Sequence, residues 1–157
     1  MIFKPIVPAD YTHLTSFFSE QRYQLCPYSL SSIIVWKNEV YQPYGAIHND
    51  SLLVYANFTR HKERSYLILP ISPGRESSPE ELSHISSQTG YGTYCFVPED
   101  YIERHGKSTI EKYFVVEQQD GYDDYVYRTE DLATLAGNRY SKKRNLVKQF
   151  ERNYLDQ

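Results

Sequence analysis

The chain has 157 residues, 40% of them hydrophobic and 24% charged, which is enough for one packed domain and short for two. It has no run of 18 apolar residues, and its N-terminus lacks the basic start, apolar stretch and cleavage site of a secretory signal. We therefore expect a cytoplasmic chain without a transmembrane segment. Its charge is unevenly spread, because residues 1–137 carry a net charge of −7 and residues 138–157 carry +4.

The first predicted elements are two helices and a three-stranded meander. Apolar residues at spacings of three and four predict a helix over residues 11–18, with Asp10 as its N-cap. The run "SLSSIIVWK", residues 29–37, fits a buried helix or a strand, and its serines, which can cap a helix, favour the helix. The three strands are predicted at residues 40–49, 51–58 and 65–71, and Asn49-Asp50 separates the first two.

The rest of the chain alternates between helices and strands. Ser78-Pro79-Glu80-Glu81 and Gly90 have the chemistry of the two ends of a helix over residues 78–90. Shorter helices are predicted at residues 99–106 and 129–137, strands at 91–98, 110–118 and 124–128, and a basic helix at 141–154. This order predicts a mixed α/β (α+β) fold with a largely antiparallel sheet flanked by helices.

Metal and nucleotide motifs are missing from the sequence. The five histidines never fall at the spacing of metal ligands, and Cys26 and Cys95 are too few and too far apart for a paired zinc motif or a disulfide framework. There is no nucleophile elbow and no P-loop pattern, and Gly90-Tyr91-Gly92 follows a predicted helix instead of preceding one. We therefore expect reduced thiols, no metal site and no cofactor.

An acidic cluster at Asp120, Asp123 and Asp124 is the best sequence candidate for acid–base or cation chemistry. It fits a solvated turn built on Asp120-Gly121, which is the more ordinary interpretation. In the functional interpretation, Asp124 pairs with a basic residue of the following helices or with the amine of a ligand.

The basic segment near the C-terminus is the other candidate site. Six cations fall in fourteen residues: Arg139, Lys142, Lys143, Arg144, Lys148 and Arg152. If the segment is a helix, four residues form an apolar face on it: Leu146, Val147, Phe150 and Tyr154. The cations suit nucleic acid or anionic lipid without distinguishing between them. The alternative is a helix packed by its apolar face with its charges merely solvated.

Two stretches of the chain resemble a known family. The stretch "DYVYRTEDLATLAGNRYSKKRNLVKQFERNY", residues 124–154, resembles the centre of bacterial proteins related to the C-terminal domain of phosphatidylglycerol lysyltransferase. In those proteins an Asp-Tyr-x-Tyr strand leads into Leu-x-x-Leu-x-Gly-x-x-Tyr-x-x-Lys-Arg-Asn. The corresponding residues are Asp124-Tyr125-Val126-Tyr127, Leu132, Leu135, Gly137, Tyr140 and Lys143-Arg144-Asn145. The segment "PYSLSSIIVWK", residues 27–37, also looks like the N-terminal part of the family.

The resemblance implies two tandem acetyltransferase-like (GNAT) domains, as in aminoacyltransferases that use aminoacyl-tRNA as donor. Residues 1–137 would form the N-terminal GNAT-like domain. Residues 138–157 would form a basic amphipathic helix that either connects to a second domain or serves as a partner-binding terminus. Family members continue through that second domain, so we expect these 157 residues to be inactive alone.

The implied partners follow from this arrangement. The protein partner is a second GNAT-like domain or another copy of the chain in a homodimer. The other partner is tRNA or an anionic lipid surface, whose phosphates the six cations would contact. Contact with lipid would place the chain at the periphery of the membrane. Asp124, Tyr125 and Tyr127 are candidate pocket residues beside those cations. The alternative function is a stand-alone, non-catalytic binding or dimerisation module whose apolar helix face packs on a partner.

Overall fold

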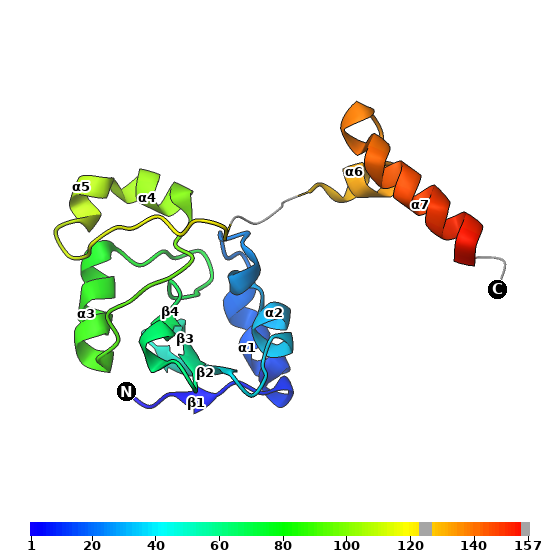
Figure 1. Cartoon of the computed structure of the whole chain (residues 1–157). Coiled ribbons are helices and arrows are strands. Elements are labelled where there is room, and N and C mark those ends of the chain that lie inside the picture. Colours follow the sequence, from blue (N-terminus) through cyan, green and yellow to red (C-terminus); the bar gives the residue numbers. More distant parts are fainter. Residues whose placement is uncertain (123–126, 155–157) are drawn as a thin grey trace. The chain divides into compact units, whose positions relative to one another are not determined.

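The computed structural model describes residues 1–122 and 127–154, and the chain divides into two compact units, Met1–Asp124 and Tyr125–Gln157 (Figure 1). The N-terminal unit holds an antiparallel four-stranded sheet in the order β1-β2-β3-β4. The strands are β1 (Lys4–Pro5), β2 (Tyr41–His48), β3 (Ser51–Phe58) and β4 (Tyr66–Leu67). With helices on both faces, this is the predicted mixed α/β fold, and it is consistent with a GNAT-like architecture.

The centre of the sheet is the predicted hairpin of β2 and β3. Its two-residue loop, Asn49-Asp50, has positive φ at both positions (47° and 58°), the backbone of a tight hairpin turn that asparagine and aspartate tolerate. Gly45 pairs with Lys4 of β1, and a Cβ at Gly45 would lie 3.1 Å from the Ile6 side chain. A glycine at this position therefore lets the N-terminal segment approach β2 closely.

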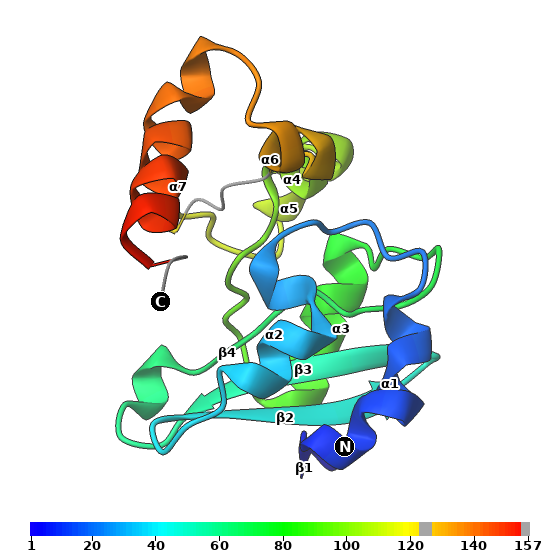
Figure 2. The ribbon, with the colours of Figure 1, turned by 90° about the vertical axis from the view of Figure 1, so that its right-hand side faces the viewer.

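Helices cover both faces of the sheet (Figures 1 and 2). On one face lie α1 (Tyr11–Phe18) and α2 (Leu30–Val35), and on the other lies α3 (Pro79–Thr89). Beyond one end of the sheet come α4 (Glu99–His105) and α5 (Lys107–Ile110), and short 3₁₀ turns lie at η1 (Pro8–Asp10), η2 (Cys26–Tyr28) and η3 (Lys62–Arg64). The helices predicted at residues 11–18, 29–37, 78–90 and 99–106 are confirmed.

The ends of α3 follow directly from its sequence. Ser78 is the N-cap: its Oγ accepts a hydrogen bond from the Glu81 backbone N–H at 3.2 Å. The Ser78 N–H donates in return to the Glu81 carboxylate at 2.8 Å, which completes a capping box. Gly90 closes the helix in the left-handed conformation, with φ of 76°.

Both faces of β3 are buried. Leu52 and Val54 face a large core cluster that also includes Ile33 of α2 and Tyr101 of α4. The intervening Leu53 faces the opposite side, where it packs with Leu67 and Ile85 of α3. Since alternate residues of a strand point to opposite faces, the apolar run of β3 matches its position between two layers of helices.

Three predicted strands differ from the structure. Residues 110–118 form the end of α5, a turn and an irregular segment, although Phe114 and Val116 pack on the core and Val115 is 87% exposed. Residues 91–98 are reduced to a parallel bridge between Tyr94 and Leu67, because Phe96, with φ of 56°, turns the chain away. Most of the strand predicted at residues 124–128 lies outside the described residues, and Tyr127 and Arg128 are not in a strand.

Other predicted boundaries shift by a few residues. The strand predicted at 65–71 is shortened to β4, and β1 is an additional strand. Asp10 precedes α1 as expected, but its carboxylate accepts from the Val7 N–H at 2.9 Å and so caps the turn before the helix. The helix predicted at 129–137 is α6 (Thr129–Thr134), and it ends when Leu135 takes a φ of 48°.

Candidate functional site

The C-terminal unit is a pair of helices joined by a turn, and the side chain of Arg144 is hydrogen-bonded to the backbone of that turn. After α6, η4 (Asn138–Tyr140) leads into α7 (Ser141–Tyr154), and α7 confirms the predicted basic helix. The guanidinium of Arg144 donates through Nη1 to the carbonyl oxygens of Leu135 and Gly137, the second at 2.7 Å. These two carbonyls follow the end of α6, where intrahelical donors run out. Arg144 therefore fixes the turn between α6 and α7.

A pocket of about 480 Å³ lies within this unit. Its lining consists of aromatic rings, cations and one carboxylate: Tyr127, Arg128, Asp131, Arg139, Tyr140 and Lys143. The volume lies within the range of small-ligand sites. Tyr140 is 4% exposed, and it is the only buried side chain among the described residues of the unit. It is therefore the most enclosed of the side chains that line the pocket.

Three charged groups of the pocket have defined partners: Asp131, Arg139 and Lys143. Nη2 of Arg139 donates to Oδ2 of Asp131 at 2.6 Å, and the same guanidinium lies 4.7 Å from the centre of the Tyr140 ring. Nζ of Lys143 lies 5.2 Å from the centre of the Tyr127 ring. Both cations are held against aromatic faces, an arrangement that orients them without neutralising their charge. With Arg128, the lining contains three cations and one carboxylate, so its formal charge is positive.

The structure separates the six predicted cations into three groups. Arg139 and Lys143 line the pocket, and Arg144 is used in the turn. The other three have exposed side chains on α7: Lys142, Lys148 and Arg152. The cations thus line a small pocket and, where Lys148 and Arg152 lie one helical turn apart, form the basic surface of α7.

The predicted apolar face of α7 is exposed in the described structure. Leu146 is 64% exposed, Phe150 is 58% exposed, and Val147 and Tyr154 are 46% and 61% exposed. The rings of Phe150 and Tyr154 lie 5.3 Å apart and form one patch with their aliphatic neighbours. One helix therefore presents both cations and apolar groups.

The candidate pocket residues from the sequence have different outcomes. Asp124 and Tyr125 lie outside the described residues, whereas Tyr127 lines the pocket. Sequence reasoning missed Arg128, Asp131 and Tyr140 as pocket residues. The signal for Tyr140 was its place in the Leu-x-x-Leu-x-Gly-x-x-Tyr pattern, but nothing local indicates that Asp131 reaches Arg139 across eight positions.

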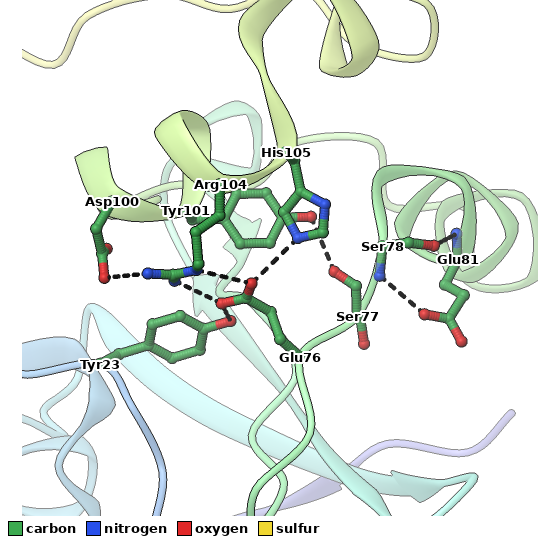
Figure 3. Close-up of polar contacts among 9 residues, drawn as sticks. All are labelled: Tyr23, Glu76, Ser77, Ser78, Glu81, Asp100, Tyr101, Arg104 and His105. Atoms are coloured by element: carbon green, nitrogen blue, oxygen red, sulfur yellow. Dashed lines mark hydrogen bonds and ion pairs between the residues drawn. The ribbon is translucent and has the colours of Figure 1, made fainter.

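A second polar cluster, which the sequence analysis did not predict, lies in the N-terminal unit around Glu76 (Figure 3). Oε1 of Glu76 accepts from the Tyr23 hydroxyl at 3.1 Å and from Nη2 of Arg104 at 2.7 Å. Its Oε2 lies 3.1 Å from Nε of Arg104 and 3.1 Å from Nε2 of His105. Arg104 also donates to Asp100 at 2.6 Å. The cluster ties the loop before α3 to α4 and to the segment before η2.

The environment of this cluster keeps Glu76 ionised. Burial alone would raise the pKa of its carboxyl, but hydrogen bonds from Arg104, Tyr23 and His105 outweigh burial and hold the pKa below its usual value. Burial and the Glu76 charge in turn raise the pKa of the Tyr23 phenol. Both carboxylate oxygens of Glu76 already accept hydrogen bonds, so the side chain is better suited to holding elements together than to transferring a proton.

Residues 1–122 and 127–154 show neither a metal centre nor a membrane-spanning helix. No group of three or more His, Cys, Asp or Glu in this part of the chain is placed to hold a metal ion. In the same described segments, no helix is long and apolar enough to span a bilayer.

Among the comparisons with known proteins, a family model matches the chain. The comparisons with curated proteins and with solved structures gave no match. Residues 21–156 match the family model described as "Phosphatidylglycerol lysyltransferase, C-terminal". The match extends over the Glu76 cluster, the pocket and α7, and covers well over half of the chain. The chain therefore belongs to the phosphatidylglycerol lysyltransferase C-terminal family, as its resemblance to that family predicted.

Proposed function

We propose that the chain acts as the N-terminal GNAT-like half of an aminoacyltransferase that takes its amino acid from aminoacyl-tRNA, and that it does not complete the reaction alone. A second GNAT-like domain or another copy of the chain would supply the rest. The proposal includes a cytoplasmic location, with contact to an anionic lipid surface as the other source of phosphates. Family membership, the positively charged pocket and the basic surface of α7 support it.

The basic surface of α7 is the observation that carries the proposal. Lys148 and Arg152 are one helical turn apart and exposed, so both can reach successive phosphates of a strand. Arg144 precedes them at the same spacing but is partly occupied by backbone carbonyls. Lys148 and Arg152 are therefore better suited to a binding test than Arg144, whose replacement would also disturb the turn.

In this proposal the N-terminal unit binds and positions substrates without supplying a catalytic base. Its best-connected carboxylate, Glu76, has both oxygens hydrogen-bonded, and the Tyr23 phenol is held protonated by its raised pKa. Neither group offers a free base to an acceptor amine or hydroxyl. This supports a half that binds and positions, with the chemistry completed by its partner.

A salt titration of tRNA binding tests the proposal. We expect the wild-type affinity to fall steeply with salt, and the double replacement Lys148→Gln and Arg152→Gln to make the slope of log affinity against log salt shallower by about 1 to 2. The control is Arg60→Gln with Lys62→Gln, which removes the same charge from an exposed part of the N-terminal unit. Equal slopes for the two double variants would refute phosphate binding by α7.

The exposed apolar face supports the second candidate function, a non-catalytic binding or dimerisation module. Its members Leu146 and Phe150 are both more than half exposed, which is unusual for side chains of this size in one stripe. Association through this face should hold or strengthen as salt increases, in contrast to binding of phosphates. Particle mass measured across the same salt series therefore distinguishes the two functions.

A further inference from the structure

The pocket of the C-terminal unit already contains an anion, and this anion belongs to the protein. Asp131 of α6 occupies the guanidinium of Arg139 at 2.6 Å. The pair is open to solvent, since the Arg139 side chain is 68% exposed and that of Asp131 is 35% exposed. An ion pair in this setting contributes little to stability and exchanges readily with external ions. A competing anion can therefore replace Asp131 as the partner of Arg139 at low cost in free energy.

In the described part of the chain, no hydrogen bond or ion pair occupies the side chains of the other two cations of the pocket, Arg128 and Lys143. Lys143 is oriented by the face of Tyr127, and a contact of this kind leaves the N–H groups of an ammonium able to donate. Arg128, which follows Tyr127 in the sequence and immediately precedes α6, also lines the pocket and contributes a second guanidinium. Together with Arg139 these groups can supply several charge-assisted hydrogen bonds to one small group.

We propose that this pocket binds a phosphate group and that Asp131 competes with the phosphate for Arg139. The proposal rests on the phosphate-binding function proposed above and deepens it, because it assigns a discrete site and an internal competitor. Phosphate is favoured over a carboxylate because three cations around one small cavity match its three or four acceptor oxygens and its higher charge. Tyr127 and Tyr140 form the apolar walls against which the group that carries the phosphate would rest.

A competing carboxylate has a measurable consequence. Replacing Asp131 with asparagine keeps the size of the side chain and removes the internal anion, so Arg139 loses its charged partner and the net charge of the pocket rises by one. Phosphate affinity should then increase, whereas a purely structural Asp131 would leave it unchanged or reduce it. Glu130 is the matched control, because it is the neighbouring acid in the first turn of α6 and does not line the pocket.

The experiment is a titration of the full chain with inorganic phosphate at constant ionic strength, followed by the amide NMR signals of the pocket residues. We expect Asp131→Asn to bind roughly three- to fivefold more tightly than the wild type, the size of one exposed ion pair, and Glu130→Gln to bind like the wild type. Lys143→Gln should weaken binding by a similar factor. Retained helical circular dichroism verifies that each variant is folded.

Two outcomes would overturn the inference. One is equal affinity for phosphate in Asp131→Asn and Glu130→Gln, and the other is unchanged binding in Lys143→Gln, which does not depend on the Asp131 variant being folded. Glycerol 3-phosphate and adenosine 5′-monophosphate, titrated in parallel, distinguish a lipid-type from a nucleotide-type carrier, and tighter binding of either one supports the site.

The proposed function and this inference can fail separately. Binding of tRNA that depends on Lys148 and Arg152, without any effect of Asp131, would retain the function and refute the internal competitor. Phosphate binding that responds to Asp131, in a chain that does not bind tRNA, would retain the site and refute the function.

Discussion

Glu76 joins three segments that are far apart in the chain. Its carboxylate contacts Tyr23 before η2 and both Arg104 and His105 at the end of α4 (Figure 3). The Glu76 side chain is only 11% exposed, so its charge depends on these partners in place of water. The adjacent Ser77 carbonyl accepts a hydrogen bond from the buried Tyr101 hydroxyl at 2.9 Å, which adds a second link between the same loop and α4.

Replacing Glu76 with glutamine should therefore destabilise the N-terminal unit. The amide keeps one acceptor but removes the charge that Arg104 and His105 face, and we expect a loss of about 2 kcal/mol in the free energy of unfolding at pH 7. Chemical denaturation followed by circular dichroism measures this change. Glu80→Gln is the control, since Glu80 is exposed on α3. A loss no larger than that of the control would show that the cluster contributes nothing to stability.

The same replacement has a predictable dependence on pH. Because the pKa of Glu76 is lowered on folding, its contribution to stability is fully present above its usual value near 4.5 and is lost as the pH falls through the folded value. The difference in unfolding free energy between the wild type and Glu76→Gln should thus shrink as the pH falls below about 4.5. A difference that grows below that pH would contradict this.

At the scale of elements, Tyr28 connects the segment after β4 with residues 91–98 at the point where the two diverge. The Leu67 N–H donates to the Thr93 carbonyl at 2.9 Å, but the pairing does not continue beyond Cys95. The Tyr28 hydroxyl lies at that point: it accepts from the Leu69 N–H at 3.3 Å and donates to the Phe96 carbonyl at 3.0 Å. A buried side chain thus replaces the missing backbone ladder.

The variant Tyr28→Phe should lower the free energy of unfolding, because it removes the hydroxyl that makes both hydrogen bonds. The ring still fills its place, but the Leu69 N–H and the Phe96 carbonyl lose their partner in a buried site, and we expect a loss of about 1 to 3 kcal/mol in unfolding free energy. The control is Tyr113→Phe, because the Tyr113 ring is 41% exposed and its hydroxyl can bond to water. Slowed amide exchange at Leu69 in the variant would argue against the assigned role.

The elements show how far local sequence determines this fold. The ends of α3 were predictable because Ser78, Glu81 and Gly90 act within one helix. The strand predicted at residues 110–118 was wrong, although Phe114 and Val116 pack on the core and Val115 does not. An apolar run shows that side chains can be buried, but it does not show that a backbone partner is present. The Glu76 cluster was missed for a related reason, since its members meet only after folding.

On the scale of the whole molecule, the two units differ in how they are stabilised. The large core cluster and the cluster of Leu53, Leu67 and Ile85 draw only on the N-terminal unit. In the described part of the C-terminal unit, Tyr140 alone is buried, and its helices depend on the hydrogen bonds of Arg144 and on the exposed ion pair of Arg139 with Asp131. A segment of this size without a core folds weakly by itself. Stability and phosphate binding should therefore reside in different units.

A chain shortened to residues 1–122 tests this division. We expect it to unfold cooperatively with a free energy within about 1 kcal/mol of the full chain, because none of the described residues 127–154 belongs to either core cluster. The same shortened chain should lose binding of tRNA and of inorganic phosphate, since every proposed contact is deleted. Calorimetry and a binding titration measure the two properties on one sample. If the shortened chain lost its sharp unfolding transition, the C-terminal helices would be part of the stable fold and their exposed apolar face would have a structural role. If it kept phosphate affinity, the anion site would lie in the N-terminal unit.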